Sequence, residues 1–111
     1  MTAVFVLHRA DGAPSSTVFR QQAFGANDPF AQAREIAWEG PDAMAAGRVA
    51  LTGELDVASF PHIETIAIIE GELTLEAAGA APLVLGPGDG AVIGGGTALR
   101  VTAASRVLFT F

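Results

Sequence analysis

The chain consists of short apolar runs separated by glycine-rich segments, and this pattern becomes regular after Gly47. The apolar runs predict strands at residues 3–7, 35–38, 48–51, 64–69, 72–76, 83–85, 91–93, 99–102 and 107–111. The segments between them predict turns at 52–53, 70–71, 78–79, 86–90, 94–96 and 104–105. Evenly spaced short strands with such turns, and without helical stretches between them, are typical of an all-β sandwich or barrel.

Between residues 15 and 41 the pattern is weaker, and residues 31–38 are compatible with either a helical turn or a strand. We expect a strand at 35–38 that ends before Gly40 and Pro41. No linker or internal repeat divides the chain. We therefore expect one domain over 1–111, with N-terminal strands and an arm at 1–46 and the barrel motifs at 47–111.

The run Ile66-Ala67-Ile68-Ile69 is apolar at every position, whereas a strand with one solvated face alternates apolar and polar residues. Another element should therefore cover the outer face of this strand. Two candidates remain open at this point, namely the chain's own N-terminal segment and a second subunit.

The acidic composition excludes several classes of function. Twelve acidic and six basic residues give a net charge of -6, and the bases are arginines scattered singly, whereas nucleic-acid binding needs clustered positive charge. The absence of lysine and cysteine excludes Schiff-base, thiolate and disulfide chemistry. No apolar run approaches the roughly 20 residues that cross a bilayer, and no secretory signal is recognisable. We expect a cytoplasmic protein without nucleic-acid or membrane partners.

The segment from Gly88 to Ala103 resembles the second sequence motif of the cupin superfamily. In register, Gly88 opens the motif, Gly94 stands where proline is usual, and Gly96 matches. Leu99 occupies the position of the family's histidine and Ala103 that of its asparagine. The resemblance covers residues 47–111. It implies a double-stranded β-helix, the RmlC-like jelly-roll barrel of cupins.

The stretch PHIETIAIIEGELTL, residues 61–75, resembles the first cupin motif. Glu64 and Gly71 keep the interval between the motif's glutamate and its last glycine, but neither possible register supplies a histidine. The histidine positions fall on Val57 and Ser59 or on Ala58 and Phe60. With Pro61 before the glutamate, the motifs are most similar to ureidoglycine aminohydrolase domains and their single-domain relatives, a branch that includes metal-dependent enzymes.

The sequence lacks the residues of a complete cupin metal centre, which generally combines imidazole nitrogens with a carboxylate. His8 and His62 are the two histidines, and only Glu64 remains of the family's ligand positions. His62 and Glu64 would share one face of an extended strand, so they form either a partial metal site or a hydrogen-bonded pair. We expect no cofactor, with a divalent metal as the less favoured alternative.

Burying an unpaired carboxylate is unfavourable, so an inward-pointing Glu64 requires a partner. Arg48, Ser59 and Thr97 are the candidates for this partner. Glu64 could then act as a general acid or base, or serve only as a structural acid at the start of a strand.

The resemblance implies that Glu64 and Leu99 face the barrel interior, and alternation along their strands then predicts an apolar ligand pocket around Glu64. Its expected wall consists of Ile66, Ile68, Leu99 and Val101, with Phe60 and Trp38 at the rim. The leading hypothesis is a small-molecule-binding cupin, expected as a homodimer, without an intact metal centre. One alternative is a small-metabolite enzyme that uses Glu64 and His62 as acid and base or as partial metal ligands. The other is an interaction module whose barrel is packed solid.

Overall fold

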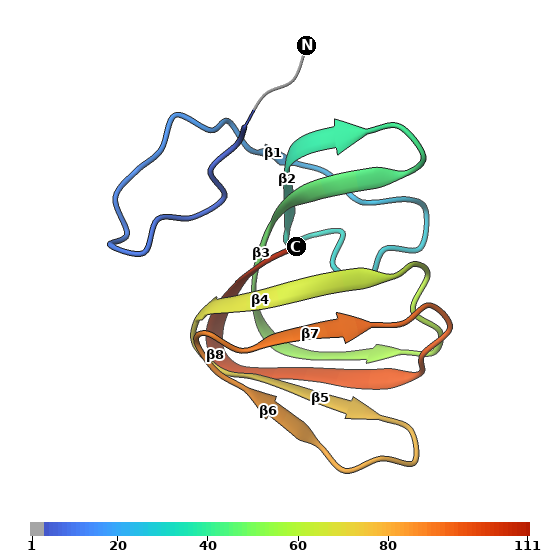
Figure 1. Ribbon diagram of the computed structural model, residues 1–111. Helices are drawn as coiled ribbons and strands as arrows, with labels where there is room; N and C mark the ends of the chain where they lie inside the picture. Colours follow the sequence, from blue (N-terminus) through green and yellow to red (C-terminus); the bar gives the residue numbers. More distant parts are fainter. Residues whose placement is uncertain (1–3) are drawn as a thin grey trace.

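The computed structural model describes residues 4–111, which form eight β-strands (Figure 1). They are β1 (Arg20–Gln21), β2 (Arg34–Gly40), β3 (Met44–Val57), β4 (Glu64–Glu70), β5 (Leu73–Ala77), β6 (Leu83–Leu85), β7 (Gly90–Ile93) and β8 (Leu99–Thr110). Within this described part of the chain there is no helix long and apolar enough to cross a membrane. The expected all-β architecture is confirmed.

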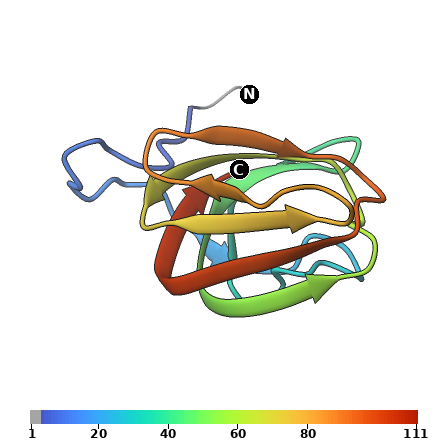
Figure 2. The same ribbon diagram turned by 90° about the horizontal axis from the view of Figure 1, so that it is seen from below.

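The strands form a jelly roll in which β3 and β8 take part in both layers. The hydrogen-bonded order is β1-β2-β3-β8-β4-β7, and β5 pairs with both β8 and β6. Residues 108–110 of β8 pair with β4, whereas residues 99–102 pair with β5. Figures 1 and 2 show the two long strands curving from one layer to the other. This arrangement is the double-stranded β-helix that the sequence motifs implied.

The long strands bend where the sequence predicted chain reversals. The pairing of β3 with β8 shifts register between Leu51 and Gly53, and Gly53 has a φ angle of 105°. The partners of these two residues on β8 lie on either side of residues 104–105. The turns predicted at 52–53 and 104–105 are therefore wrong, because both signals mark one bulged bend through which the strands continue.

The predicted strand at residues 3–7 is also wrong where it can be assessed. Ala3 lies outside the described residues, and residues 4–7 pair with no described strand. The nearby hydrogen bond from Ser15 Oγ to the carbonyl of Val6, at 3.5 Å, is local. A β-branched composition favours a strand only where a neighbouring strand completes the ladder, and in both views this N-terminal segment lies to one side of the barrel (Figures 1 and 2).

Strand β4 alternates between the barrel interior and solvent. Glu64, Ile66 and Ile68 are only 4, 1 and 2% exposed, whereas Thr65 and Ala67 are exposed. Since Ala67 is exposed, the described part of the N-terminal segment does not cover the outer face of β4. Cover by a second subunit stays a prediction.

The space between the two layers is filled by apolar side chains. Phe109 and Val101 of β8 are 0% exposed, and Phe30 and Phe60 reach the same core from connecting segments. The ring of Phe30 lies 5.5 Å from that of Phe109 and 6.1 Å from that of Phe60, measured between centroids. This packing gives the inward-pointing polar side chains a rigid support.

Candidate functional site

The segment between β1 and β2 folds around the carboxylate of Asp28. Its oxygens accept hydrogen bonds from the backbone N–H groups of Phe24, at 2.8 Å, and Phe30, at 3.0 Å. Aspartate often organises turns through such bonds to nearby backbone. The backbone N–H of Arg34 donates to the carbonyl of Phe30 at 2.8 Å. The segment therefore brings Asp28 and the first residue of β2 together.

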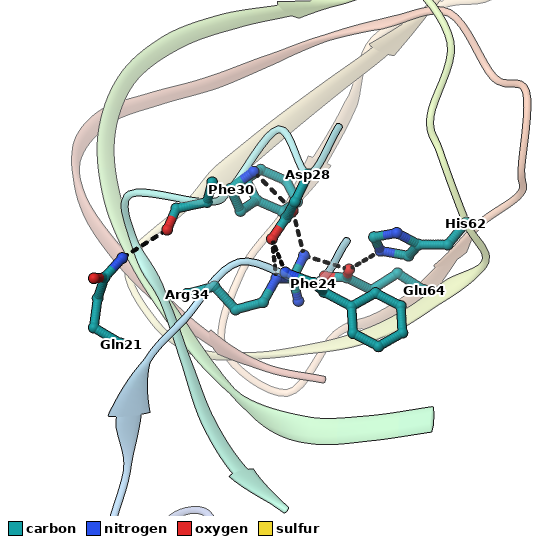
Figure 3. A network of polar contacts seen from close by, with 8 residues as sticks. Gln21, Phe24, Asp28, Phe30, Arg34, His62 and Glu64 are labelled. Atoms are coloured by element: carbon teal, nitrogen blue, oxygen red, sulfur yellow. Dashed lines mark hydrogen bonds and ion pairs between the residues drawn. The ribbon is translucent and has the colours of Figure 1, made fainter. Parts of the chain in front are cut away.

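The side chain of Arg34 is fully buried and joins this segment to β4. Its Nε donates to Asp28 Oδ2 at 2.6 Å, and its Nη2 donates to Asp28 Oδ1 at 2.9 Å. The same Nη2 donates to Glu64 Oε1 at 2.7 Å (Figure 3). The ring of Phe111 lies 4.4 Å from the guanidinium carbon. Charge-assisted hydrogen bonds of this kind are stronger than neutral ones, so the network fixes the position of Glu64.

The network keeps Asp28 and Arg34 charged although both are buried. Burial by itself raises the pKa of Asp28, but hydrogen bonds from Arg34 and two backbone amides outweigh it and hold that pKa below its ordinary value. Burial lowers the pKa of Arg34, while its two carboxylate partners raise it above the ordinary value overall. Asp28 and Arg34 are therefore a buried ion pair at neutral pH.

His62 lies at the edge of the site and contacts Glu64. Its Nε2 is 2.7 Å from Glu64 Oε1, and its side chain is 16% exposed. The rings of Phe24 and Phe60 pack edge-on against the imidazole, with centroid distances of 4.8 and 4.9 Å. Figure 3 shows the imidazole directed at the carboxylate. The histidine and glutamate thus form the hydrogen-bonded pair that was one of the two alternatives from the sequence.

The second carboxylate oxygen of Glu64 has no hydrogen-bond partner among residues 4–111. Oε2 is buried, and no described residue donates to it. A cavity of about 30 Å³ borders Glu64, which is enough for about one water molecule. Its other lining residues are Phe24, Arg34, Ala45, His62 and Phe111. The site therefore combines one unused buried acceptor with room for one small polar group.

The partner of Glu64 differs from the three candidates expected from the sequence. Arg48 instead pairs with Glu35 at 2.9 Å on the outer surface. The hydroxyl of Thr97 donates to a backbone carbonyl at 2.8 Å, and Ser59 is exposed. These three side chains therefore do not supply the charge that compensates Glu64.

Arg34 supplies this charge, and strand alternation contained a signal for it. Arg34 and Ile36 share a face of β2, and Ile36 is 1% exposed. An arginine two positions before a buried isoleucine in a strand should itself point inward. Asp28 carries no comparable signal, because it lies in an irregular segment without periodicity.

The expected apolar wall forms part of the hydrophobic core. Ile66, Ile68, Leu99 and Val101 form this wall, and Phe60, which was expected at the rim, lies in the same core. The cavity beside Glu64 is lined by a different set of side chains, and Trp38 is 38% exposed on β2. The proposed role of all these residues in contacting a ligand remains a prediction.

The donor set does not fit a cupin metal centre. Among residues 4–111, no group of three or more histidine, cysteine, aspartate or glutamate side chains could hold a metal ion. Leu99, at the histidine position of the second motif, is apolar and pairs with Val57, which is one of the candidate histidine positions of the first motif and is also apolar. The remaining ligand position, Glu64, already accepts a hydrogen bond from a guanidinium.

Comparison with solved structures places this architecture among known proteins. A protein of unknown function from Pseudomonas syringae pv. tomato, assigned to the DUF861 family, is 35% identical with a TM-score of 0.88, covering 94% of this chain and 44% of that one. A cupin-2 domain containing protein from Shewanella frigidimarina is 20% identical with a TM-score of 0.56, covering 68% of this chain and 72% of that one. The chain therefore has the cupin fold.

Further comparisons add little beyond the fold. The EutQ protein of Clostridium difficile is 16% identical to this chain with a TM-score of 0.54, covering 60% of this chain and 52% of that one. The chain spans 44% of the length of the Pseudomonas protein, so it corresponds to only part of that relative. No protein-family model and no curated protein sequence matches it. The likeness to ureidoglycine aminohydrolase domains stays a prediction.

Proposed function

We propose that this cupin binds a small molecule at Glu64 without a metal ion. The main support is the Oε2 atom of Glu64, a buried acceptor with no hydrogen-bond partner among the described residues. A buried polar atom left without a partner costs about 1–3 kcal/mol. A ligand that donates a hydrogen bond to Oε2 would recover this free energy, and Glu64 is one of the residues that line the nearby cavity.

The charges of the site favour a ligand with a donor group. The carboxylates of Asp28 and Glu64 outnumber the single guanidinium of Arg34, so an ammonium or a neutral N–H or O–H group is favoured over a carboxylate or phosphate. Only the tip of the ligand enters the cavity of about 30 Å³. The rest would lie against the rings of Phe24 and Phe111, which suits a small, partly apolar molecule.

The test is a thermal-shift screen of small metabolites, run with and without divalent metal ions. We expect ligands with a donor group to raise the unfolding temperature of the wild-type protein independently of metal. The variant Glu64→Gln places an amide next to the cavity and should lose this response. Glu70→Gln is the matched control, because Glu70 lies on the same strand but is exposed and pairs weakly with Arg106 at 3.4 Å. A response that survives Glu64→Gln would show that the ligand binds elsewhere.

A second candidate function, supported by the contact between His62 and Glu64, is acid–base catalysis on the bound molecule. Because the buried carboxylate of Glu64 forms a hydrogen bond with Nε2 of His62, Nδ1 of the same imidazole stays available for proton transfer. Ligands from the screen can be incubated with the protein and followed by NMR for conversion. If His62→Gln abolishes conversion but not binding, the enzyme hypothesis is supported. If the wild-type protein converts no ligand, binding alone remains.

We also propose that the chain forms a homodimer. Support comes from apolar side chains exposed on the strands, such as Val84 of β6, at 57%, and Val92 of β7, at 65%. Light scattering of the purified protein measures the mass directly. A monomer at all concentrations would contradict the proposal.

A further inference from the structure

The cation nearest to Glu64 is part of the chain itself. Nη2 of Arg34 lies 2.7 Å from Glu64 Oε1 and 2.9 Å from Asp28 Oδ1, so this one nitrogen bridges two carboxylates. Nε makes a further contact of 2.6 Å with Asp28 Oδ2. The arginine side chain is 1% exposed and its two partners are 0 and 3% exposed. A buried guanidinium needs opposite charge close by, which both carboxylates provide.

The geometry matches a guanidinium better than a spherical ion. The Nε and Nη2 atoms of Arg34 form a planar fork that meets both oxygens of Asp28, a match that an ammonium group cannot reproduce. The rings of Phe111 and Phe30 lie 4.4 and 5.6 Å from the guanidinium carbon, where aromatic faces stabilise a cation. The site thus has the charge, the fork geometry and the aromatic contacts suited to a guanidinium.

A metal ion has no comparable place at this glutamate. Leu99 places an apolar side chain at the histidine position of the second motif, and neither register of the first motif supplies an imidazole. His62 directs Nε2 at Glu64 Oε1, the oxygen that also contacts Arg34. A divalent ion bound to that oxygen would lie next to the guanidinium and be repelled by it.

We propose that Arg34 is the built-in cation of this barrel and takes the place that a metal ion has in metal-dependent cupins. Two carboxylates form a guanidinium-binding site, and Arg34 occupies it permanently. Together with His62, Arg34 engages Oε1 of Glu64 and leaves Oε2 as the free acceptor. The proposal concerns the protein without ligand, so it can fail or succeed independently of small-molecule binding.

The experiment is chemical rescue of Arg34→Ala. This variant removes the guanidinium while Asp28 and Glu64 keep their carboxylates, so its unfolding temperature should fall well below that of the wild-type protein. Ethylguanidinium ion, which replaces the atoms removed, should raise this temperature in a saturable manner. N-ethylurea, a neutral analogue of similar shape, should not. The wild-type protein, in which Arg34 fills the site, should show no saturable response to either compound.

Two controls separate this site from general effects of salt or denaturant. Arg48→Ala removes an arginine paired with Glu35 at 2.9 Å on the outer surface and should not respond to ethylguanidinium. The double variant Arg34→Ala with Asp28→Asn removes one of the two carboxylates of the site and should lose the response.

A further variant, Arg34→Lys, keeps the positive charge but lacks the planar guanidinium group. It should be less stable than the wild-type protein but more stable than Arg34→Ala.

If Arg34→Ala does not fold in buffer, the same comparison is made on its refolding yield, which should rise with ethylguanidinium and not with N-ethylurea. Equal responses to the two compounds, or no response to ethylguanidinium in either assay, would overturn the proposal. Saturable stabilisation of the wild-type protein by manganese or zinc ions would also overturn it, because the cation site would then accept a metal while Arg34 is present.

Discussion

Replacement of Asp28 by asparagine tests whether the buried ion pair stabilises the fold. The carboxylate accepts two hydrogen bonds from Arg34 and two from backbone amides, and the residue is 8% exposed. Asparagine keeps one acceptor oxygen but removes the charge, and its amide group faces a donor of Arg34. Removing one partner of a buried ion pair costs roughly 3–5 kcal/mol.

We expect a loss at the lower end of this range, about 3 kcal/mol, because Glu64 still compensates Arg34 from the other side. For a domain of about 100 residues, each kcal/mol corresponds to at least about 4 °C in unfolding temperature. The expected shift is therefore about 12 °C or more. Urea unfolding, followed by circular dichroism and by the fluorescence of Trp38, measures the free energy. Asp56→Asn, in an exposed pair with Arg100, should change it by less than about 1 kcal/mol.

The pH dependence gives a sharper test of the same ion pair. The pKa of Asp28 lies below its ordinary value of 3.8 in the folded protein, so on acidification the unfolded chain binds a proton first. The stabilisation is complete above the unfolded pKa and disappears as the pH falls through the lower, folded pKa. The difference in stability between wild type and Asp28→Asn should therefore shrink below about pH 4. A difference that stays constant from neutral pH into this acidic range would refute the assignment.

Two further substitutions test the packing that supports the site. Phe109→Ala removes a fully buried ring from the core and should cost about 3–5 kcal/mol in urea unfolding. Gly71→Ala should also destabilise the fold by more than about 2 kcal/mol, because Gly71 has a φ of 81° and an added Cβ would meet the backbone carbonyl oxygen of Arg106. Gly79→Ala is its control, with a φ of 78° and no atom within 4 Å of the added Cβ, and equal losses for the two variants would show that the predicted clash is relieved.

The sequence predicted the strands well where local alternation and turn residues agree. The strand at 83–85 has the predicted bounds, and those at 64–69 and 91–93 differ by one residue at one end. The errors at 52–53 and 104–105 arise because a bulge and a reversal use similar residues. Only the pairing of β3 with β8 shows that the two segments lie at the same bend, and pairing between distant strands cannot be read from either segment alone.

The resemblance to the first cupin motif implied that Glu64 points into the barrel, but it did not identify the partner of this carboxylate. Arg34 is 30 positions away in sequence, and Asp28 comes from a segment in which turns replace periodic structure. The distance between these groups depends on how the segment between β1 and β2 packs against the rest of the barrel. Local sequence therefore predicts that a buried carboxylate needs a partner, whereas the identity of that partner is a property of the tertiary fold.

The two oxygens of Glu64 differ in what the fold requires of them. Oε1 contacts both Arg34 and His62, and a glutamine could supply an acceptor oxygen at the same place. Oε2 contributes no hydrogen bond to the described protein, and its burial costs about 1–3 kcal/mol out of a total stability of roughly 5–15 kcal/mol for a domain. Both oxygens share the charge that compensates Arg34, but the fold uses no hydrogen-bond acceptor at the position of Oε2. Comparing Glu64→Gln and wild type without ligand therefore separates the two roles, since a variant as stable as wild type would leave ligand binding as the reason for the second oxygen.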